Sequence, residues 1–361
     1  MTDEYPAASW QALSRLAPYN LMARFEVSTP SAAHPPAPWP IHRWLAFEDS
    51  WPPESASSLL ERLNVTSCDI VYDPFVGAGT TAGVCAQRQI DTISVDTDEI
   101  ATLVTWVKLH PPSERVLKIM RSRVARVGIK VLMRAFASRE GMCDGSDVTF
   151  PYMPFLLCAG LLRVGWHTGT TISVAGLSAE LMMILDEMGA DVRPLTLPRS
   201  AHKVYLGDSS RLTAGALHGL SGRRVVMVTS PPFFGSNTNP RKRRLARWVK
   251  TAAKSTAEAI PANQRPIVAP LADRLRAAQR TAPGRALVDN YIHFLEGLVA
   301  RCDTMNCRAV AIEMGPKVVG GAMIRFDKHL CDQLVAAQYR VTSFKEDKSG
   351  LELITTICAE R

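Results

Sequence analysis

A short apolar run passes directly into a glycine-rich turn at residues 69–81, which read Asp69-Ile-Val-Tyr-Asp73-Pro-Phe-Val-Gly77-Ala-Gly79-Thr80-Thr81. The first five residues have the apolar, β-branched character of a buried strand, and a helical pattern follows at Ala82–Arg88. Glycines in the turn allow a tight bend and a close approach of a ligand to the backbone. The helix beyond presents unpaired N–H groups. The stretch therefore predicts a strand, a ligand-binding turn and a helix.

The alternation of strands and helices continues on both sides of this stretch. A strand is expected at Asp91–Asp96, followed by a helix from about Asp98 to Lys108. This order begins a doubly wound parallel sheet, so we expect an α/β, Rossmann-like fold. Further strands are expected at residues 203–206, 224–228, 308–314, 339–344 and 351–358, and further helices at 55–63, 288–301 and 327–338.

A second motif ends the strand expected at 224–228 and reads Val228-Thr229-Ser230-Pro231-Pro232-Phe233-Phe234-Gly235. Two successive prolines fix φ twice and remove two N–H donors, so this strand end is stiff and its carbonyls are available as acceptors. Alone, such a sequence is an ordinary turn. In the expected sheet it brings a hydroxyl, carbonyl groups and an aromatic ring to the edge where ligands bind.

Together the two motifs resemble those of S-adenosylmethionine-dependent DNA amino-methyltransferases, which modify N4 of cytosine or N6 of adenine. Asp73–Thr81 looks like the cofactor motif Asp-Pro-Phe-x-Gly-x-Gly-Thr-Thr, and Ser230–Phe233 looks like the catalytic motif Asp/Asn/Ser-Pro-Pro-Tyr/Phe/Trp. The resemblance implies that S-adenosylmethionine is the cofactor and DNA the substrate. Serine at the first catalytic position favours cytosine N4, while adenine N6 stays open.

The same resemblance implies a set of cofactor-binding residues at the ends of the first three strands. They are Asp73, Phe75, Gly77, Gly79, Thr80, Thr81, Asp96, Asp98 and Asp208. An acid at the end of the second strand accepts hydrogen bonds from ribose hydroxyls in nucleotide-binding folds. Asp96 is the first candidate for this role and Asp98 the alternative. The segment Pro40–Trp44 also resembles, loosely, one that crosses the cofactor site in this family.

The catalytic residues implied by the resemblance are Ser230, Pro231, Pro232 and Phe233. The lone pair of an exocyclic base nitrogen is delocalised into the ring, so the nitrogen is a poor nucleophile. Ser230 Oγ and the Pro231 carbonyl are expected to accept hydrogen bonds from its two protons and so free the lone pair. The Phe233 ring is expected to stabilise the positive charge that develops on the nitrogen.

A strongly basic stretch follows the second motif. Its expected nucleic-acid-binding residues are Arg241, Lys242, Arg243, Arg244, Arg247, Trp248 and Lys250. Cations interleaved with an aromatic ring suit a nucleic-acid backbone. A target base must also rotate out of the DNA double helix to be methylated, so we expect phosphate contacts beside the pocket that would receive the base. A solvated charged surface is the alternative interpretation.

The motifs divide the chain into four parts. Residues 51–109 and 200–361 are assigned to the S-adenosylmethionine-binding catalytic domain, and residues 110–199 to a large insertion between the second and third motif strands. The insertion contains a basic helical stretch at Arg115–Arg134 and is a possible target-recognition region. Residues 1–50 are expected to be extended, and 236–286 a basic loop or helical segment within the catalytic domain.

Composition limits the classes of protein to which the chain can belong. With 361 residues, 47% of them hydrophobic, it is long enough to bury a large core, and its net charge of +8 suits a polyanionic partner. The eight cysteines form no Cys-x-x-Cys pair, so we expect reduced thiols and no metal. We expect no secretory signal, no membrane span and a cytoplasmic location. A homodimer or a separate specificity partner stays open.

Three other functions compete with a DNA methyltransferase. The same chemistry on RNA is the first, and a catalytically silent nucleic-acid-binding protein that keeps the fold as a scaffold is the second. A dinucleotide-dependent oxidoreductase is the third. The turn lacks the third glycine of the dinucleotide fingerprint, and no Gly-Lys-Ser/Thr follows it as in a P-loop.

Overall fold

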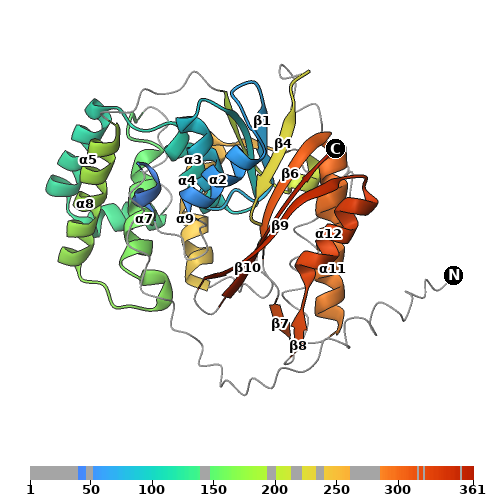
Figure 1. Cartoon of the computed structure of the whole chain (residues 1–361). Helices are drawn as coiled ribbons and strands as arrows, with labels where there is room; N and C mark the ends of the chain where they lie inside the picture. The colour runs from blue at the N-terminus through green and yellow to red at the C-terminus, as the bar shows by residue number, and fades with distance from the viewer. Residues whose placement is uncertain are drawn as a thin grey trace.

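The computed structural model describes residues 40–45, 52–138, 147–192, 201–212, 222–232, 240–260, 285–314, 317–319, 322–349 and 352–361 of the chain. Within these ranges the chain forms an eight-stranded sheet with helices on its faces, a block of helices beside it, and a small separate hairpin (Figure 1). The hairpin consists of β7 (Lys317–Val319) and β8 (Ala322–Ile324).

The large sheet has the strand order β5-β3-β2-β1-β4-β6-β10-β9. The strands are β1 (Ile70–Asp73), β2 (Asp91–Asp96), β3 (His202–Leu206), β4 (Val225–Thr229), β5 (Glu258–Ala259), β6 (Cys307–Met314), β9 (Arg340–Ser349) and β10 (Glu352–Glu360). The first six in this order are parallel, whereas β10 is antiparallel to both β6 and β9. Chain order reverses between β1 and β4, which confirms the predicted doubly wound, Rossmann-like sheet.

Helices cover both faces of the sheet, as its sequence pattern requires. On one face Val71, Val226 and Ala311 pack with α2 (Pro53–Arg62) and α3 (Thr80–Gln87). On the other face Tyr72 and Met227 pack with α11 (Arg285–Thr304) and α12 (Phe326–Ala336). Strands buried on both sides are expected to be apolar throughout, and the central strands β1 and β4 are entirely buried.

The predicted insertion between the second and third strands is confirmed, and it is helical. After α4 (Glu99–Leu109) it contributes what we call the helical layer, which lies to the left of the sheet in Figure 1. The layer consists of α5 (Glu114–Val127), α6 (Ile129–Ser138), α7 (Tyr152–Arg163), η2 (Trp166–Thr168) and α8 (Val174–Val192). These helices share one core with α4 and with the later helix α9 (Pro240–Thr256).

Some elements differ from the sequence-based predictions. The single basic helix expected at Arg115–Arg134 is two helices, because Gly128 has φ +80 and ends α5. The described part of the N-terminal segment contains a 3-10 helix, η1 (His42–Trp44), and is not extended. The basic stretch after the second motif, expected to be a loop or a helical segment, is helical over α9. Residues 1–39, 233–239 and 261–284 lie outside the described residues.

Candidate cofactor and substrate site

The glycine turn between β1 and α3 has one packed side and one open side. Gly79 has φ +72, and a Cβ there would lie 2.8 Å from Thr105 Oγ1 on α4. Gly77 has φ +51, and a Cβ there would lie no closer than 3.9 Å to any described atom. Only glycine lets the loop sit this close to α4, while the side at Gly77 is left accessible to a ligand.

Asp73 ends β1 and anchors the start of the turn. Its Oδ1 accepts hydrogen bonds from Thr229 Oγ1 at 2.7 Å and from the Phe75 N–H at 3.1 Å. The side chain is buried, and burial raises its pKa to about 6. Thr229 is the last residue of β4, so this carboxyl group connects the glycine turn to the strand of the second motif.

Asp96, at the end of β2, is bound to the same turn. Its Oδ2 accepts from the Gly77 N–H at 3.0 Å, and its Oδ1 accepts from the Asp98 N–H at 2.9 Å. Burial, and next the charge of Asp98, raise the pKa of Asp96 to about 7. Asp98 instead caps α4, because its Oδ1 accepts from the Ile100 N–H at 2.8 Å. The first candidate for the ribose, Asp96, therefore lies at the glycine turn, whereas the alternative, Asp98, caps a helix.

Asp208 follows β3, the next strand in the sheet. Its side chain accepts a hydrogen bond from the Ser210 N–H at 2.9 Å and caps η3 (Ser209–Arg211). The preceding Gly207 donates from its N–H to the Asp96 carbonyl at 2.8 Å. The structure thus brings Asp208, Asp96, Asp73 and Ser230 to the carboxyl ends of four neighbouring strands, β3, β2, β1 and β4.

The Ser-Pro-Pro segment leaves β4 beside these acids. Ser230 and Pro232 are half-buried and Pro231 is buried. The Pro232 carbonyl accepts a hydrogen bond of 3.0 Å from the hydroxyl of Tyr291 on α11, so this carbonyl is not left free as the sequence suggested. Phe233 lies outside the described residues.

Phe75 and the two threonines of the first motif support the turn from the protein side. The Phe75 ring is half-buried and lies 5.4 Å from the ring of Phe294 on α11, between centroids. Thr80 and Thr81 are buried in the first turn of α3. Their side chains therefore belong to the packing beneath the glycine turn.

Lys108 is the first of two buried charged residues near the carboxyl ends of the strands that the motifs did not identify. It lies on α4, is only 3% exposed, and its Nζ donates a hydrogen bond of 2.6 Å to the Ala78 carbonyl in the glycine turn. Burial lowers its pKa to about 7. In the sequence, the indication that Lys108 is buried was its position in the mostly apolar helix Glu99–Leu109.

Glu313 is the second such residue. It lies on β6, directly after the residue that pairs with Thr229, and so beside the strand end that carries Ser230. It is 8% exposed, and burial raises its pKa to about 7. An acid near the end of the apolar strand Cys307–Met314 was its only sequence signal.

The predicted nucleic-acid-binding residues lie on α9, which has no acidic residue. Arg243, Arg244, Arg247 and Lys250 are exposed, and Lys242 is half-buried. Arg241 is exposed but its side chain donates to the Trp166 carbonyl at 2.9 Å. The half-buried Trp248 packs against Phe136 and Trp166, with ring centroids at 5.4 and 5.6 Å. The structure therefore gives Trp248 a packing contact and leaves the cations at the surface.

Two other kinds of feature, a metal-binding cluster and a membrane-spanning helix, are absent from the described ranges. No cluster of three or more His, Cys, Asp or Glu side chains there is arranged to hold a metal ion. No helix there combines the length and apolarity needed to cross a bilayer. The cysteines that the structure describes are free thiols, most of them buried.

Comparisons with known proteins give a limited likeness. No family model matches the chain. Over 56 residues the chain is 30% identical to the Type II methyltransferase M.BsoBI of Geobacillus stearothermophilus, which is 16% of this chain and 11% of that protein. The chain thus matches about a tenth of the length of this relative.

Two solved structures of the rRNA methyltransferase aviRa from Streptomyces viridochromogenes align with the chain at 12% identity. The alignments cover 86% and 95% of this chain and 85% and 96% of theirs, with TM-scores of 0.34 and 0.33. Values this low support no conclusion about function.

Proposed function

We propose that this protein transfers a methyl group from S-adenosylmethionine to the exocyclic amine of a base in DNA, with cytosine N4 favoured over adenine N6. The main support for the proposal is that the two motifs follow neighbouring strands, β1 and β4, between which the chain order of the sheet reverses. There Thr229, next to Ser230, is hydrogen-bonded to Asp73 of the cofactor turn. The short likeness to a Type II methyltransferase supports the same reaction class.

The residues of the glycine turn suit S-adenosylmethionine as a ligand. The side of the turn at Gly77 is not packed against the protein, and the Asp96 carboxylate lies beside it. A carboxylate there can accept hydrogen bonds from ribose hydroxyls. The Asp208 carboxylate, on the next strand, would accept a hydrogen bond from the amino group of the cofactor's adenine. When bound, S-adenosylmethionine supplies an electrophilic methyl group.

The protein's part in the reaction is to orient the amine and remove a proton. Ser230 Oγ and the Pro231 carbonyl would accept hydrogen bonds from the two amine protons, and Tyr291 would keep the turn rigid through Pro232. Phe233 would stabilise the cationic nitrogen by facing it. Glu313, as a carboxylate, would take the proton that the methylated nitrogen releases and become neutral.

The exposed cations of α9 support a nucleic acid as the substrate. Four of the predicted residues, Arg243, Arg244, Arg247 and Lys250, are exposed on a helix without acidic residues. Such a surface suits phosphates, which supply most of the affinity of a protein for DNA. The insertion at 110–199 is proposed to contribute to target recognition.

The decisive experiment is transfer of labelled methyl from S-adenosylmethionine to unmethylated DNA and, in parallel, to RNA, with mass spectrometry of the digested nucleosides. We expect N4-methylcytosine in the DNA pool, and its loss in Phe233→Ala while cofactor affinity changes less than about threefold. Methylated nucleosides in RNA alone would move the proposal to an RNA substrate. Cofactor binding with no transfer to either would indicate a scaffold.

Glu313 has a separate test at saturating cofactor. Because its pKa is raised to about 7, turnover of the wild type is expected to fall as the pH drops below about 7. Glu313→Gln should be slower and should lose this pH dependence. A variant with the wild-type profile would remove Glu313 from the mechanism.

A further inference from the structure

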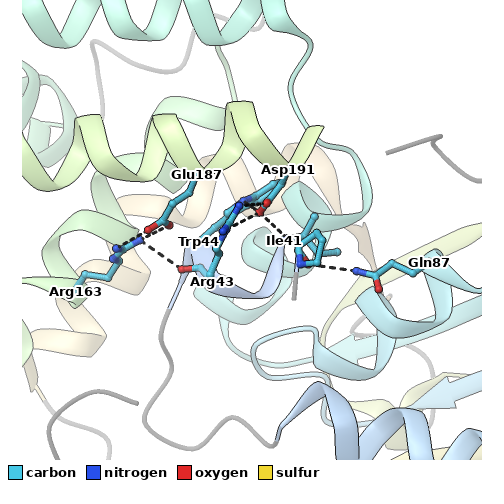
Figure 2. A network of polar contacts seen from close by, with 8 residues as sticks. Ile41, Arg43, Trp44, Gln87, Arg163, Glu187 and Asp191 are labelled. Carbon is cyan, nitrogen blue, oxygen red and sulfur yellow. Dashed lines mark hydrogen bonds and ion pairs between the residues drawn. The ribbon is translucent and has the colours of Figure 1, made fainter. Parts of the chain in front are cut away.

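One carboxylate of the helical layer holds the described N-terminal segment in place. Asp191, near the end of α8, is 3% exposed (Figure 2). Its Oδ2 accepts from the Ile41 N–H at 2.9 Å, from Trp44 Nε1 at 2.7 Å and from Arg43 Nε at 3.1 Å. Its Oδ1 forms an ion pair with the Arg43 guanidinium. Every one of these donors comes from η1 or the residue before it.

The conformation of this segment depends on that carboxylate. Ile41 has φ +65, a left-handed conformation that is unfavourable for a β-branched residue. Its N–H nevertheless points to Asp191, as Figure 2 shows. Burying a carboxylate is costly unless donors and an opposite charge compensate for it, and here they all come from one short segment. Removing Asp191 therefore leaves η1 without its main anchor.

The segment is also attached to two further helices. Arg163 of α7 pairs with Glu187 of α8 and donates to the Arg43 carbonyl at 3.4 Å. On the other side, Gln87 Nε2 of α3 donates to the Pro40 carbonyl at 3.3 Å. Because α3 begins directly after the glycine turn, η1 bridges the helical layer and the cofactor-binding half of the sheet.

Two buried side chains continue the connection to the glycine turn. His42 of η1 packs so closely on α3 that a Cβ at Gly83 would lie 2.8 Å from its ring. His42 also lies near enough to Lys108 for the lysine charge, after burial, to lower the pKa of the histidine. Lys108 in turn donates to the Ala78 carbonyl of the turn at 2.6 Å. The connection from Asp191 to the turn thus runs through the packing of η1 on α3 and through the charge of Lys108 near His42.

We propose that Asp191 is a positioning residue for the cofactor: by fixing η1 against α3 and Lys108, it sets the shape of the glycine turn, so that cofactor affinity depends on the helical layer. This rests on the proposed function, since it takes the turn at residues 75–81 to be the cofactor site. Asp191 itself touches neither cofactor nor substrate.

The test compares Asp191→Asn with Asp186→Asn. Both residues lie on α8, but Asp186 is 67% exposed and pairs only with Arg121 among the described residues. Calorimetry with S-adenosylmethionine should show an affinity about tenfold weaker in Asp191→Asn and no change in Asp186→Asn. Far-UV circular dichroism spectra like that of the wild type in both variants would exclude a general loss of folding as the cause.

A double-mutant cycle tests the path itself. Lys108→Met should also weaken cofactor binding, and combining it with Asp191→Asn should give less than the product of the two effects, because both act through the same contacts. Multiplicative effects would mean that Asp191 does not act through Lys108. If Asp191→Asn is poorly folded, Trp44→Phe removes a single donor and should weaken cofactor binding about threefold.

Amide hydrogen exchange separates this inference from the proposed function, since it needs no cofactor. Exchange at residues 76–80 should be faster in Asp191→Asn than in the wild type or Asp186→Asn. Unchanged exchange at these amides, or unchanged cofactor affinity, would overturn the role of Asp191. A wild-type chain that binds no S-adenosylmethionine but shows the exchange effect would instead overturn the proposed function.

Discussion

Thr229 donates a hydrogen bond of 2.7 Å to Asp73 and so joins the ends of β4 and β1 where chain order in the sheet reverses. From β1 the sheet continues through β2 and β3 in one direction, and from β4 through β6 in the other. Loops that leave these two strands diverge, and doubly wound sheets bind their ligands at such a place. One hydrogen bond therefore links the glycine turn to the Ser-Pro-Pro motif.

Removing this bond is expected to weaken cofactor binding. Thr229→Val keeps the shape of the side chain but removes one of the hydrogen-bond donors to the buried Asp73, which should raise the pKa of Asp73 further above about 6. We expect cofactor affinity to fall about tenfold by calorimetry at neutral pH. Thr229→Ser retains the hydroxyl and should bind nearly as the wild type. Equal affinities in both variants would show that the bond is only structural.

Asp96 is expected to make cofactor binding depend on pH. Burial and the Asp98 charge raise its pKa to about 7, and its ionised form is the better acceptor for ribose hydroxyls. Affinity should therefore fall as the pH drops from about 8 to about 6. Asp96→Asn should bind more weakly and lose most of this dependence. The remaining slope would then belong to Asp73, whose pKa is also raised.

The same shift has the opposite effect on the stability of the ligand-free protein. A carboxyl group whose pKa is higher in the folded state holds its proton more readily there, so folding is favoured by protonation. Between the ordinary value of 3.8 and about 7, Asp96 should lower stability as the pH rises. Denaturant unfolding of Asp96→Asn should lack that contribution, and an identical pH dependence in both proteins would contradict the assignment.

Tyr291 is expected to affect turnover more than cofactor binding. Tyr291→Phe removes the donor to the Pro232 carbonyl and should cost about 1 kcal/mol of stability, as one hydrogen bond does. Because the bond holds the Ser-Pro-Pro turn, turnover should drop while cofactor affinity stays the same. The control is Tyr339→Phe, which removes a similar hydrogen bond to the carbonyl of Cys307 at the start of β6, away from the Ser-Pro-Pro turn. If both variants lower turnover equally, Tyr291 has no special role.

Gly79 should not tolerate a side chain. In Gly79→Ala the new Cβ would lie 3.1 Å from Thr105 Cα, and the backbone would keep a positive φ. We expect a loss of about 2 kcal/mol in stability and of measurable cofactor binding. Gly222→Ala also has positive φ but no atom within 4 Å, so it should cost about 1 kcal/mol and leave cofactor binding intact. Thermal unfolding and calorimetry distinguish the two.

The cations of α9 should determine the salt dependence of DNA binding. Replacing Arg244, Arg247 and Lys250 with glutamine should lower the slope of log affinity against log salt by about 2 to 3, close to one counterion per charge. Three exposed cations elsewhere provide a control with the same change in net charge: Arg308, Lys328 and Arg340. Equal slopes in the two triple variants would mean that the cations of α9 form a solvated surface and do not contact DNA.

Local sequence patterns were sufficient to predict the sheet around the glycine turn. The strands at 70–73 and 91–96 and the turn between them follow from apolar runs and two glycines, which act over a few residues. The basic helix α9 was harder to predict. Its buried face consists of Leu245, Val249, Ala252 and Ala253, and alanines give a weak apolar signal between so many cations.

Contacts between distant residues could not be predicted from the sequence. Nothing near Tyr291 indicates that its hydroxyl reaches Pro232, 59 positions earlier in the chain, or that Asp191 would bind Trp44. The sequence favoured Asp96 but kept Asp98 as the alternative, because either acid at a strand end suits a ribose. The hydrogen bonds separate them, since one binds the glycine turn and the other caps a helix.

The packing of α9 has a consequence for how a long polyanion would meet this protein. The apolar face of α9 packs in the same core as the helical layer, so its cations have fixed positions relative to the rest of the fold. The distance between the cations of α9 and Ser230, at the end of β4, is therefore also fixed. If phosphates bind α9, this distance determines how far along the strand the methylated base lies from the bound phosphates.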